Sequence, residues 1–373
     1  MTKVTIFYSS RKYFIKKIPK IYKSFSELVH ESDEKPKIFI HKGLTTSQDE
    51  DNELPEPEYI ENLVIDSDEY SSVNDHVIIN FANFIASYKI SNLYVQNPPE
   101  KLREQIEKAF SKGVEIDLQK YSVISKTNIN KFHKNFSKEI IGQDSSGESI
   151  ATSLIPLLLK NRRKPVVILL YGNSGIGKTE SVKLLSKTIG EKLFRKQFSM
   201  YQNNEFATYL FGGKHNEKSF AKDLLDRESN VILLDEFDKA DPVFFSAFYQ
   251  LFDEGIFVDK NYSVILEKSI IICTSNFKSE QEIEEKLGSA IFSRFDKLIE
   301  FKDLSDEAKR KISGDFFTKL SRNYEKELSI TLPENIRNYI EENVSEWNNV
   351  REIKNFIEDT LAYYYLTKIL NNQ

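Results

Sequence analysis

The feature that most constrains the fold is the stretch VVILLYGNSGIGKT at residues 166–179. Its first half is an apolar run rich in β-branched residues, which predicts a buried strand. Its second half is a glycine-rich turn of the pattern G-x-x-x-x-G-K-T, and a helical pattern follows it. A strand that leads through such a turn into a helix is typical of a phosphate-binding loop in a parallel α/β sheet, because the glycines let backbone N–H groups surround a phosphate at the helix N-terminus.

The loop predicts roles for its own residues. We expect Lys178 to reach the β and γ phosphates of ATP and Thr179 to hold Mg²⁺. A chance glycine turn is the alternative, but the flanking strand and helix and a second, acidic strand further along the chain argue against it. The other nucleotide-contacting residues that we expect here are Gly172, Asn173, Ser174, Gly175, Ile176, Gly177 and Glu180.

Two further strands supply the remaining chemistry of hydrolysis. The segment SNVILLDEFDKADP (229–242) has four apolar residues that end in Asp235 and Glu236. We expect Asp235 to hold the Mg²⁺ shell and Glu236 to polarise the water that attacks the γ-phosphate. The segment KSIIICTSNF (268–277) places Asn276 at a strand end, where it could bond the attacking water or the γ-phosphate; a turn asparagine is the alternative.

Composition limits the class of protein. A chain of 373 residues has room for two or three domains, and none of its apolar runs approaches the length of about 18 residues that a bilayer crossing needs. Cys273 is the only cysteine, which rules out an intrachain disulfide and favours a cytoplasmic location. A net charge of −5 gives no general attraction to nucleic acid.

Residues 1–125 predict a separate, small α/β domain. Strand-like runs occur at 4–8, 37–41, 62–66 and 92–96, and a helical pattern occupies 99–113. An acidic, proline-containing segment at 45–58 is typical of a solvated loop. No motif in this domain indicates what it does.

The first two dozen residues interleave basic and aromatic side chains. We expect an amphipathic helix with a lysine-rich outer face. A nucleic-acid surface stays open as the alternative, since such surfaces combine the same residue types. Residues 122–136 predict a polar, basic connector to the ATPase region.

From about residue 136 to the C-terminus, the chain resembles the AAA+ ATPases, specifically the Clp/heat-shock unfoldase clade. IIGQD (140–144) resembles the entry motif of that clade, and VILLDEFDKADPVFFSAFYQLFDEGIFVD (231–259) follows its strand-and-helix pattern. The resemblance identifies the loop and the acidic strand as Walker A and Walker B motifs. It implies a large ATPase subdomain at 126–302, with a five-stranded parallel sheet flanked by helices, and a helical lid at 303–373.

The resemblance also implies further site residues. Ile141 and Gly142 match the residues around the adenine, and Asn276 matches sensor 1. Arg294, in SRFD, matches the arginine finger, and Arg351, in NVREIK, matches sensor 2 of the lid. An arginine finger acts on the nucleotide of a neighbouring subunit, so the resemblance implies a homo-oligomeric ring, with a hexamer favoured.

The chain departs from the family pattern in two places. Asn349 and Val350 stand where the family has Gly-Ala, and Asn355 stands where a second basic residue is common. Clp unfoldases place an aromatic pore loop, Gly-Tyr-Val-Gly, in the interval that corresponds to residues 209–230. Its absence here resembles the torsins and puts polypeptide threading in doubt.

Three functions of different class follow. The first is an ATPase of the chaperone type that remodels a protein client or partner. The second is a nucleic-acid motor or loader, which the basic segments favour and which would bind DNA with strong salt dependence. The third is a nucleotide-gated scaffold, for which assembly rather than turnover is the function.

Overall fold

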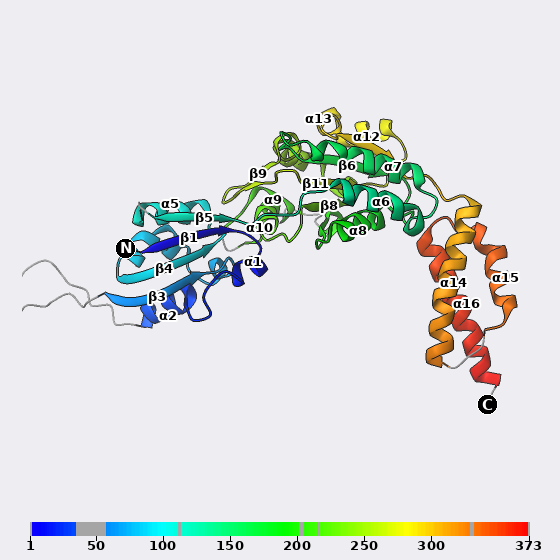
Figure 1. Cartoon of the computed structure of the whole chain (residues 1–373), viewed down its shortest axis with the longest axis horizontal. Helices are drawn as coiled ribbons and strands as arrows, with labels where there is room; N and C mark the ends of the chain where they lie inside the picture. The colour runs from blue at the N-terminus through cyan, green and yellow to red at the C-terminus, as the bar shows by residue number, and fades with distance from the viewer. Residues whose placement is uncertain are drawn as a thin grey trace, which may run out of the picture. The chain divides into compact units, whose positions relative to one another are not determined.

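The chain forms two compact units that do not follow the linear order of the sequence. The computed structural model describes residues 2–34, 57–110, 113–200, 205–214, 217–328 and 332–371. The first unit contains residues 1–121, 203–227 and 256–265, and the second contains the remainder (Figure 1). Within the described ranges, none of the helices has the length and apolarity needed to cross a bilayer.

A five-stranded parallel sheet organises the first unit, with the strand order β2-β3-β4-β1-β5. The central strands bury side chains on both faces of the sheet, which explains their Val, Ile, Leu and Phe content. The strands are β1 (Lys3–Tyr8), β2 (Lys23–Ser24), β3 (Glu58–Ile65), β4 (Tyr88–Gln96) and β5 (Val114–Leu118).

Helices cover both faces of this sheet. Phe14 of α1 packs with Phe7 and Val64 on one face. The opposite face is covered by the larger helices, whose buried side chains include Leu28, Phe81 and Leu102. The helices are α1 (Arg11–Ile15) on the first face, and α2 (Phe25–Glu34), α3 (Asp75–Ile79), α4 (Phe81–Ile85) and α5 (Glu100–Ala109) on the second.

The expectations for the N-terminal region are partly confirmed. The runs at 4–8, 62–66 and 92–96 lie in β1, β3 and β4, and the helix predicted at 99–113 is α5. The strand expected at 37–41 and nearly all of the segment 45–58 lie outside the described residues.

The prediction of an amphipathic helix with a lysine-rich outer face over the first two dozen residues is wrong. Helix α1 has five residues, and the chain turns after it. Two of the basic side chains there bond acidic partners of the same unit: Arg11 pairs with Asp66, and Lys23 pairs with Glu58. These pairs account for Arg11 and Lys23 without a nucleic acid.

Two segments from the middle of the chain complete the first unit, and we call them the first insert (residues 203–227) and the second insert (residues 256–265). The first insert carries α9 (Glu205–Phe211) and α10 (Phe220–Leu225). The second is an antiparallel hairpin of β9 (Ile256–Val258) and β10 (Ser263–Ile265).

The second unit contains another five-stranded parallel sheet, with the order β12-β6-β11-β8-β7. This confirms the expected parallel sheet of the ATPase region. The strands are β6 (Val166–Tyr171), β7 (Phe194–Gln197), β8 (Val231–Asp235), β11 (Ile270–Thr274) and β12 (Lys297–Glu300).

Helices α6 (Lys126–Glu139), α7 (Asp144–Ser153) and α8 (Lys178–Ile189) pack in one hydrophobic core with this sheet. Helix α6 corrects the connector expected at 122–136: Phe132 and Phe136 are buried in that core. Three shorter helices also belong to this unit: α11 (Tyr249–Glu254), α12 (Glu280–Leu287) and α13 (Ser289–Phe292).

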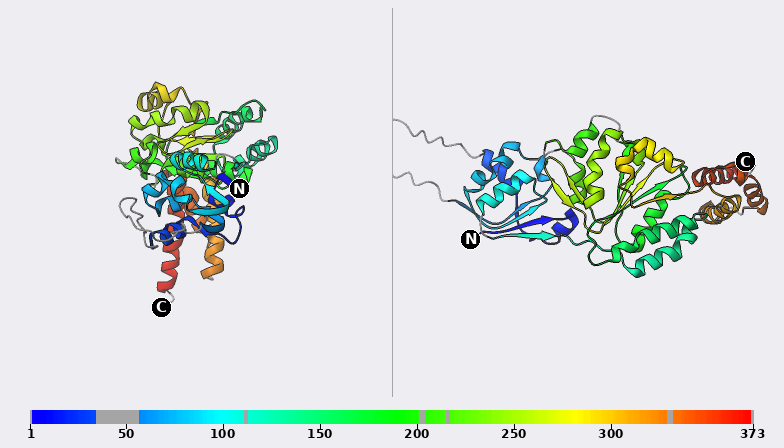
Figure 2. Two further views of the ribbon diagram at one scale, coloured as in Figure 1. Left: turned by 90° about the vertical axis from the view of Figure 1, so that its left-hand side faces the viewer. Right: turned by 90° about the horizontal axis from the view of Figure 1, so that it is seen from above.

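The chain ends in a small helical bundle, which Figure 2 shows from two sides. Ile312, Ile340, Val344 and Ile357, one from each part of the bundle, are buried in the same core cluster. The bundle consists of α14 (Asp306–Leu328), α15 (Glu334–Asn343), the 3₁₀ turn Val344–Glu346 and α16 (Val350–Asn371).

Candidate nucleotide-binding site

The glycine-rich turn joins β6 to α8 in a conformation that side chains would obstruct. Gly172 has φ 129°, and a Cβ there would lie 2.2 Å from the backbone oxygen of Phe301. Gly177 has φ 111° and forms the N-cap of α8. The backbone therefore requires glycine at both positions.

Lys178 begins α8 and points back into the turn. Its Nζ donates to the carbonyl oxygens of Gly172 and Asn173, both at 2.6 Å, and to Asn276 Oδ1 at 3.4 Å. Burial lowers the pKa of this amine to about 8, while Asp238 and Asp235 act in the opposite direction. Oxygen atoms thus already surround a partly desolvated ammonium group, as a phosphate would.

Asp235 ends β8 and is surrounded by donors. Thr179 Oγ1 donates to its Oδ1 at 3.3 Å, and the hydroxyl of Thr274, at the end of β11, bonds the same oxygen. Arg195 of β7 donates to Oδ2 through Nε at 2.9 Å and Nη2 at 2.5 Å. The carboxylate is therefore fixed in orientation although it is almost fully buried.

This arrangement fits Mg²⁺ bound together with a nucleotide. Thr179 and Asp235 bring together a hydroxyl and a carboxylate, and Mg²⁺ prefers oxygen ligands of this kind. Over the described ranges, no group of three or more His, Cys, Asp or Glu side chains could hold a metal ion unaided. The protein therefore offers a partial shell that phosphate oxygens and water would complete.

Glu236 follows Asp235 in a left-handed backbone conformation, with φ 55°. Its N–H donates to Thr274 Oγ1 at 3.0 Å, and its Oε2 accepts from Gln197 Nε2 at 3.0 Å. The residues that follow the two partners, Phe198 and Phe237, are buried and have ring centroids 5.4 Å apart. The aromatic contact therefore supports the position of both polar side chains.

These groups line one cleft of about 1010 Å³ within the second unit. Twelve of the residues expected from the sequence lie on its wall: Ile141, Ser174, Gly175, Ile176, Gly177, Lys178, Thr179, Glu180, Asp235, Glu236, Asn276 and Arg351. The groups that we expect to be catalytic and the glycine-rich turn thus meet in one place, as their positions at the carboxyl ends of parallel strands lead one to expect.

Four expected residues are not on this wall. Gly172 lies behind the turn against Phe301. Asn173 donates from Nδ2 to Asp303 Oδ1 at 2.6 Å. Gly142 has φ 81°, and a Cβ there would lie 2.9 Å from the Cβ of Ala308. These three positions form the surroundings of the cleft rather than its surface.

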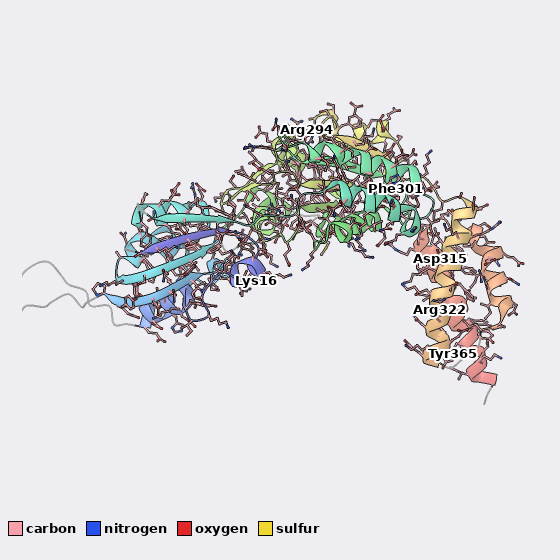
Figure 3. The ribbon with its side chains drawn as sticks, in the orientation of Figure 1. Lys16, Arg294, Phe301, Asp315, Arg322 and Tyr365 are labelled. Atoms are coloured by element: carbon pink, nitrogen blue, oxygen red, sulfur yellow. The ribbon has the colours of Figure 1, made fainter. Side chains whose placement is uncertain are left out.

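Arg294 is the fourth, and it lies just after α13 (Figure 3). Its Nε donates to Asp253 Oδ2 at 2.9 Å, and its guanidinium stands 4.2 Å from the ring centroid of Tyr249. The structure therefore does not bring Arg294 into the cleft of its own chain. Arg351 of α16, in contrast, lines that cleft.

The C-terminal bundle closes the cleft with apolar side chains. Ile312 and Phe316 of α14 and Ile141 line it, which provides a surface for a planar base. The N–H of Val350 donates to the carbonyl oxygen of Gly175 at 2.9 Å. The Asn349 side chain meets a Cβ built on Gly175 at 3.0 Å, so the residues that depart from the family pattern pack directly on the loop.

The sequence reading missed three residues of the site: Arg195, Gln197 and Thr274. Residues i and i+2 of a strand share a face, so Arg195 and Gln197 point together toward the acids of the adjacent strand. The alternation of Arg195 and Gln197 is visible in the segment FRKQ, but its meaning becomes clear only when the pairing of β7 with β8 is known.

The comparisons with known proteins agree with this site. Residues 163–329 match the sequence family described as AAA domain (Cdc48 subfamily). Chaperone protein ClpB of Clostridium perfringens is 27% identical over 307 residues, which cover 73% of this chain and 35% of the relative. The ClpB of Malacoplasma penetrans is 24% identical over 74% of this chain and 46% of the relative.

A third relative is the ClpA homolog protein of Fuscovulum blasticum, which is 28% identical over 50% of this chain and 25% of its own length. The chain spans less than half the length of these relatives. The match covers the phosphate loop, both acids, Asn276 and Arg294. The chain therefore carries an AAA+ ATPase domain of the Clp/heat-shock clade, built on a parallel α/β sheet of the P-loop type.

Proposed function

We propose that the chain hydrolyses ATP with Mg²⁺ in the cleft and uses the energy to remodel a protein partner within a homo-oligomeric ring. The observation that carries the proposal is the convergence of Lys178, Thr179, Asp235, Glu236 and Asn276 on one cleft wall. Each of these groups is of the type that phosphoryl transfer requires. We also propose the division into an N-terminal region at 1–125, a large ATPase subdomain at 126–302 and a lid at 303–373.

The buried groups suggest how the nucleotide binds. Lys178 would exchange its bonds to Gly172 and Asn173 for the β and γ phosphates. Mg²⁺, held by Thr179 and Asp235, would neutralise phosphate charge as it develops. The base would lie against the apolar lid side chains Ile312 and Phe316.

The hydrolytic step is ATP + H₂O → ADP + phosphate. A water oxygen forms a bond to the γ-phosphorus as the bond to the β–γ bridging oxygen breaks, and Glu236 accepts the proton of that water. Glu236 now bonds Gln197, so it must leave that side chain before it can orient water. Asn276 lines the cleft and can hold the water or the γ-phosphate from the neighbouring strand.

Two arginines link chemistry to assembly in this proposal. Arg294 lies outside its own cleft, which supports a role at the nucleotide of a neighbouring subunit. Arg351 lies on the lid side of its own cleft and would couple the lid to the nucleotide state. The relatives named ClpB are chaperone proteins, which favours a protein partner over a nucleic acid.

Capture with a stalled variant tests the partner class. Glu236→Gln should bind ATP, assemble and retain its partner, so we would purify it with ATP and Mg²⁺ after nuclease and high-salt washes and identify what remains. Lys178→Ala, which lacks the phosphate ligand, is the control. A protein retained by the first variant alone, and confirmed by reconstitution with the purified pair, supports the proposal. Retention of DNA or RNA in its place contradicts it.

A further inference from the structure

The sheet of the first unit has a topological switch point between β1 and β4. These strands are adjacent and parallel. The helix that follows β1 packs on one face, with Phe14 against Phe7, whereas the helix that follows β4 packs on the other, with Leu102 in the larger core. In open α/β sheets, the crevice at such a point, outside the carboxyl ends of the strands, is where a ligand binds.

The polar residues at this edge are buried. Ser9 and Ser10 follow β1, Gln96 ends β4 and Asn97 follows it; none is more than 2% exposed. Asn97 has φ 44° and bonds Ser9 through both its side-chain oxygen and nitrogen. The crevice is therefore covered rather than open to solvent.

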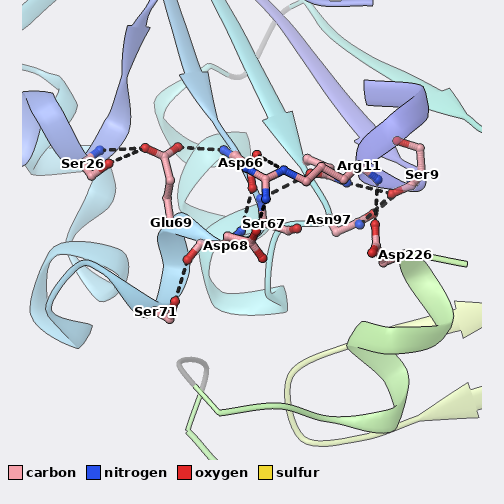
Figure 4. Close-up of polar contacts among 11 residues, drawn as sticks. Ser9, Arg11, Ser26, Asp66, Ser67, Asp68, Glu69, Ser71, Asn97 and Asp226 are labelled. Atoms are coloured by element: carbon pink, nitrogen blue, oxygen red, sulfur yellow. Dashed lines mark hydrogen bonds and ion pairs between the residues drawn. The ribbon is translucent and has the colours of Figure 1, made fainter. Parts of the chain in front are cut away.

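The first insert provides part of the cover. Asp226 Oδ1 accepts from the backbone N–H of Arg11 at 2.6 Å, immediately after β1. The Arg11 side chain bonds Asp66 and Asp68, which follow β3 (Figure 4). Arg227, next along the insert, is 6% exposed and stands 4.1 Å from the ring centroid of Tyr121. The first insert thus supplies a hydrogen-bond acceptor at the carboxyl ends of the strands, beside the switch point.

The second insert supplies another hydrogen-bond acceptor at this edge of the sheet. The carbonyl oxygen of Asn261 accepts from the backbone N–H of Glu100 at 2.8 Å, where α5 begins after β4. Asn261 and Tyr262 are 8% and 5% exposed, so the hairpin tip is buried in the unit. Each strand that flanks the switch point is therefore followed by an N–H group bonded to an insert.

The inserts are also joined to each other. Lys260 N–H donates to the carbonyl oxygen of Phe211 at 3.0 Å, and Asn261 Nδ2 donates to that of Gly213 at 3.1 Å. The rings of Phe220 and Phe257 meet edge to face with centroids 4.9 Å apart. The two inserts are therefore packed together beside the N-terminal sheet.

Both inserts are covalently continuous with the cleft. The first lies between β7, which carries Gln197, and β8, which ends at Asp235. The second precedes β11, which ends at Thr274. The inserts are therefore joined to the strands of the cleft by the chain itself.

We propose that the N-terminal sheet is a docking module whose occupants are the two inserts, which the sequence of the ATPase region contributes. The two inserts fill its switch-point crevice and transmit the nucleotide state to residues 1–121. This inference rests on the proposed ATPase cycle. By this inference, the N-terminal region is the part of the chain that hydrolysis moves.

Hydrogen exchange of the full chain tests the docking. Peptides that contain the Arg11 and Glu100 amides should exchange slowly in the wild type. Asp226→Ala should speed exchange at Arg11 at least tenfold, while Asp226→Asn, which keeps Oδ1, should retain the protection. Glu104→Ala, which also removes a carboxylate but at an exposed position of α5, is the control and should alter neither peptide. Rapid exchange of both amides in the wild type would overturn the inference.

The nucleotide dependence gives the second arm. In Glu236→Gln, the exchange of these peptides should differ between ATP and ADP, and identical exchange in both states would contradict the transmission. ATP turnover by the wild type, measured in parallel, separates the outcomes. Absence of turnover would contradict the proposed function. Normal turnover together with failure of the exchange predictions would contradict the docking alone.

Discussion

Arg195 bonds a single oxygen of Asp235, Oδ2, through both Nε and Nη2. The other oxygen, Oδ1, accepts from Thr179 and Thr274. Asp235 therefore cannot rotate without losing bonds to three different elements, α8, β7 and β11. The carboxylate that we expect to bind Mg²⁺ is positioned before the metal arrives.

Arg195→Ala should weaken the response to Mg²⁺. Groups that orient metal ligands typically contribute about 10–100-fold to metal affinity or activity, so we expect a loss of that size in ATP turnover at limiting Mg²⁺. The measurement is turnover against Mg²⁺ concentration at saturating ATP. Lys196→Ala, one residue along the same strand and on its opposite face, is the control. Equal Mg²⁺ curves for the two variants would show that Arg195 does not orient Asp235.

Gly172→Ala should abolish tight ATP binding. The new Cβ would lie 2.2 Å from the backbone oxygen of Phe301, which a side-chain movement cannot relieve. Gly190→Ala is the matched control, because Gly190 has φ 85° but nothing within 4 Å of its Cβ position. It should cost about 1–2 kcal/mol in the free energy of unfolding and leave the dissociation constant for a fluorescent ATP analogue unchanged. Normal affinity in Gly172→Ala would contradict the packing of the loop against Phe301.

ATP binding should take up a proton at Lys178. The pKa of the free amine is about 8, so roughly half of the sites are uncharged at pH 8, and phosphate binding restores the charge. Affinity should then fall as the pH rises through this value. Calorimetry in two buffers of different ionisation enthalpy measures the uptake, and Lys178→Arg, which stays charged, should lose it. Unchanged uptake in that variant would assign the proton elsewhere.

The same pKa fixes the sign of a stability change. The unfolded chain keeps its lysine proton up to the ordinary pKa of 10.5, whereas the folded protein loses it near 8. Between these values the unfolded state binds more protons, so the contribution of Lys178 makes the nucleotide-free protein more stable as the pH rises. The difference in the free energy of unfolding between wild type and Lys178→Met, followed from pH 7 to 10, measures this contribution. A difference that stays constant over that range would contradict the pKa assignment.

Mixing two inactive variants tests whether sites are shared between subunits. Arg294→Ala keeps an intact cleft but lacks the proposed finger, while Lys178→Ala lacks the phosphate ligand but retains Arg294. If Arg294 acts across an interface, the mixture should hydrolyse ATP although neither variant does so alone. A mixture that stays as inactive as its parts would indicate that Arg294 serves only its contacts with Asp253 and Tyr249.

The phosphate loop and its two acids could be predicted from the sequence because their chemistry is local. Strand, turn and helix follow one another within residues 166–189, and Asp235 and Glu236 directly follow an apolar run. Parallel pairing of β6, β11 and β8 then brings their carboxyl ends together. Local pattern and topology were sufficient for this part of the site.

The parts that could not be predicted depend on contacts between distant residues. Arg195 and Gln197 gain their meaning only from the adjacent strand. The segment 122–136 is polar, but Ile129, Phe132 and Phe136 recur at helical spacing and are buried by tertiary packing. The assignment of the two inserts to the N-terminal unit rests on contacts between residues far apart in the chain, such as that of Asp226 with Arg11, which leave no periodic pattern in the sequence.

Single-turnover hydrolysis by the full chain tests the central claim most directly. With Mg²⁺ and radiolabelled ATP, the wild type should release phosphate, while Glu236→Gln should bind ATP with similar affinity and hydrolyse it at least a hundredfold more slowly, because the attacking water loses its general base. Hydrolysis by Glu236→Gln at the wild-type rate would contradict the account, since the cleft would then not be the site of the chemistry that we assign to it.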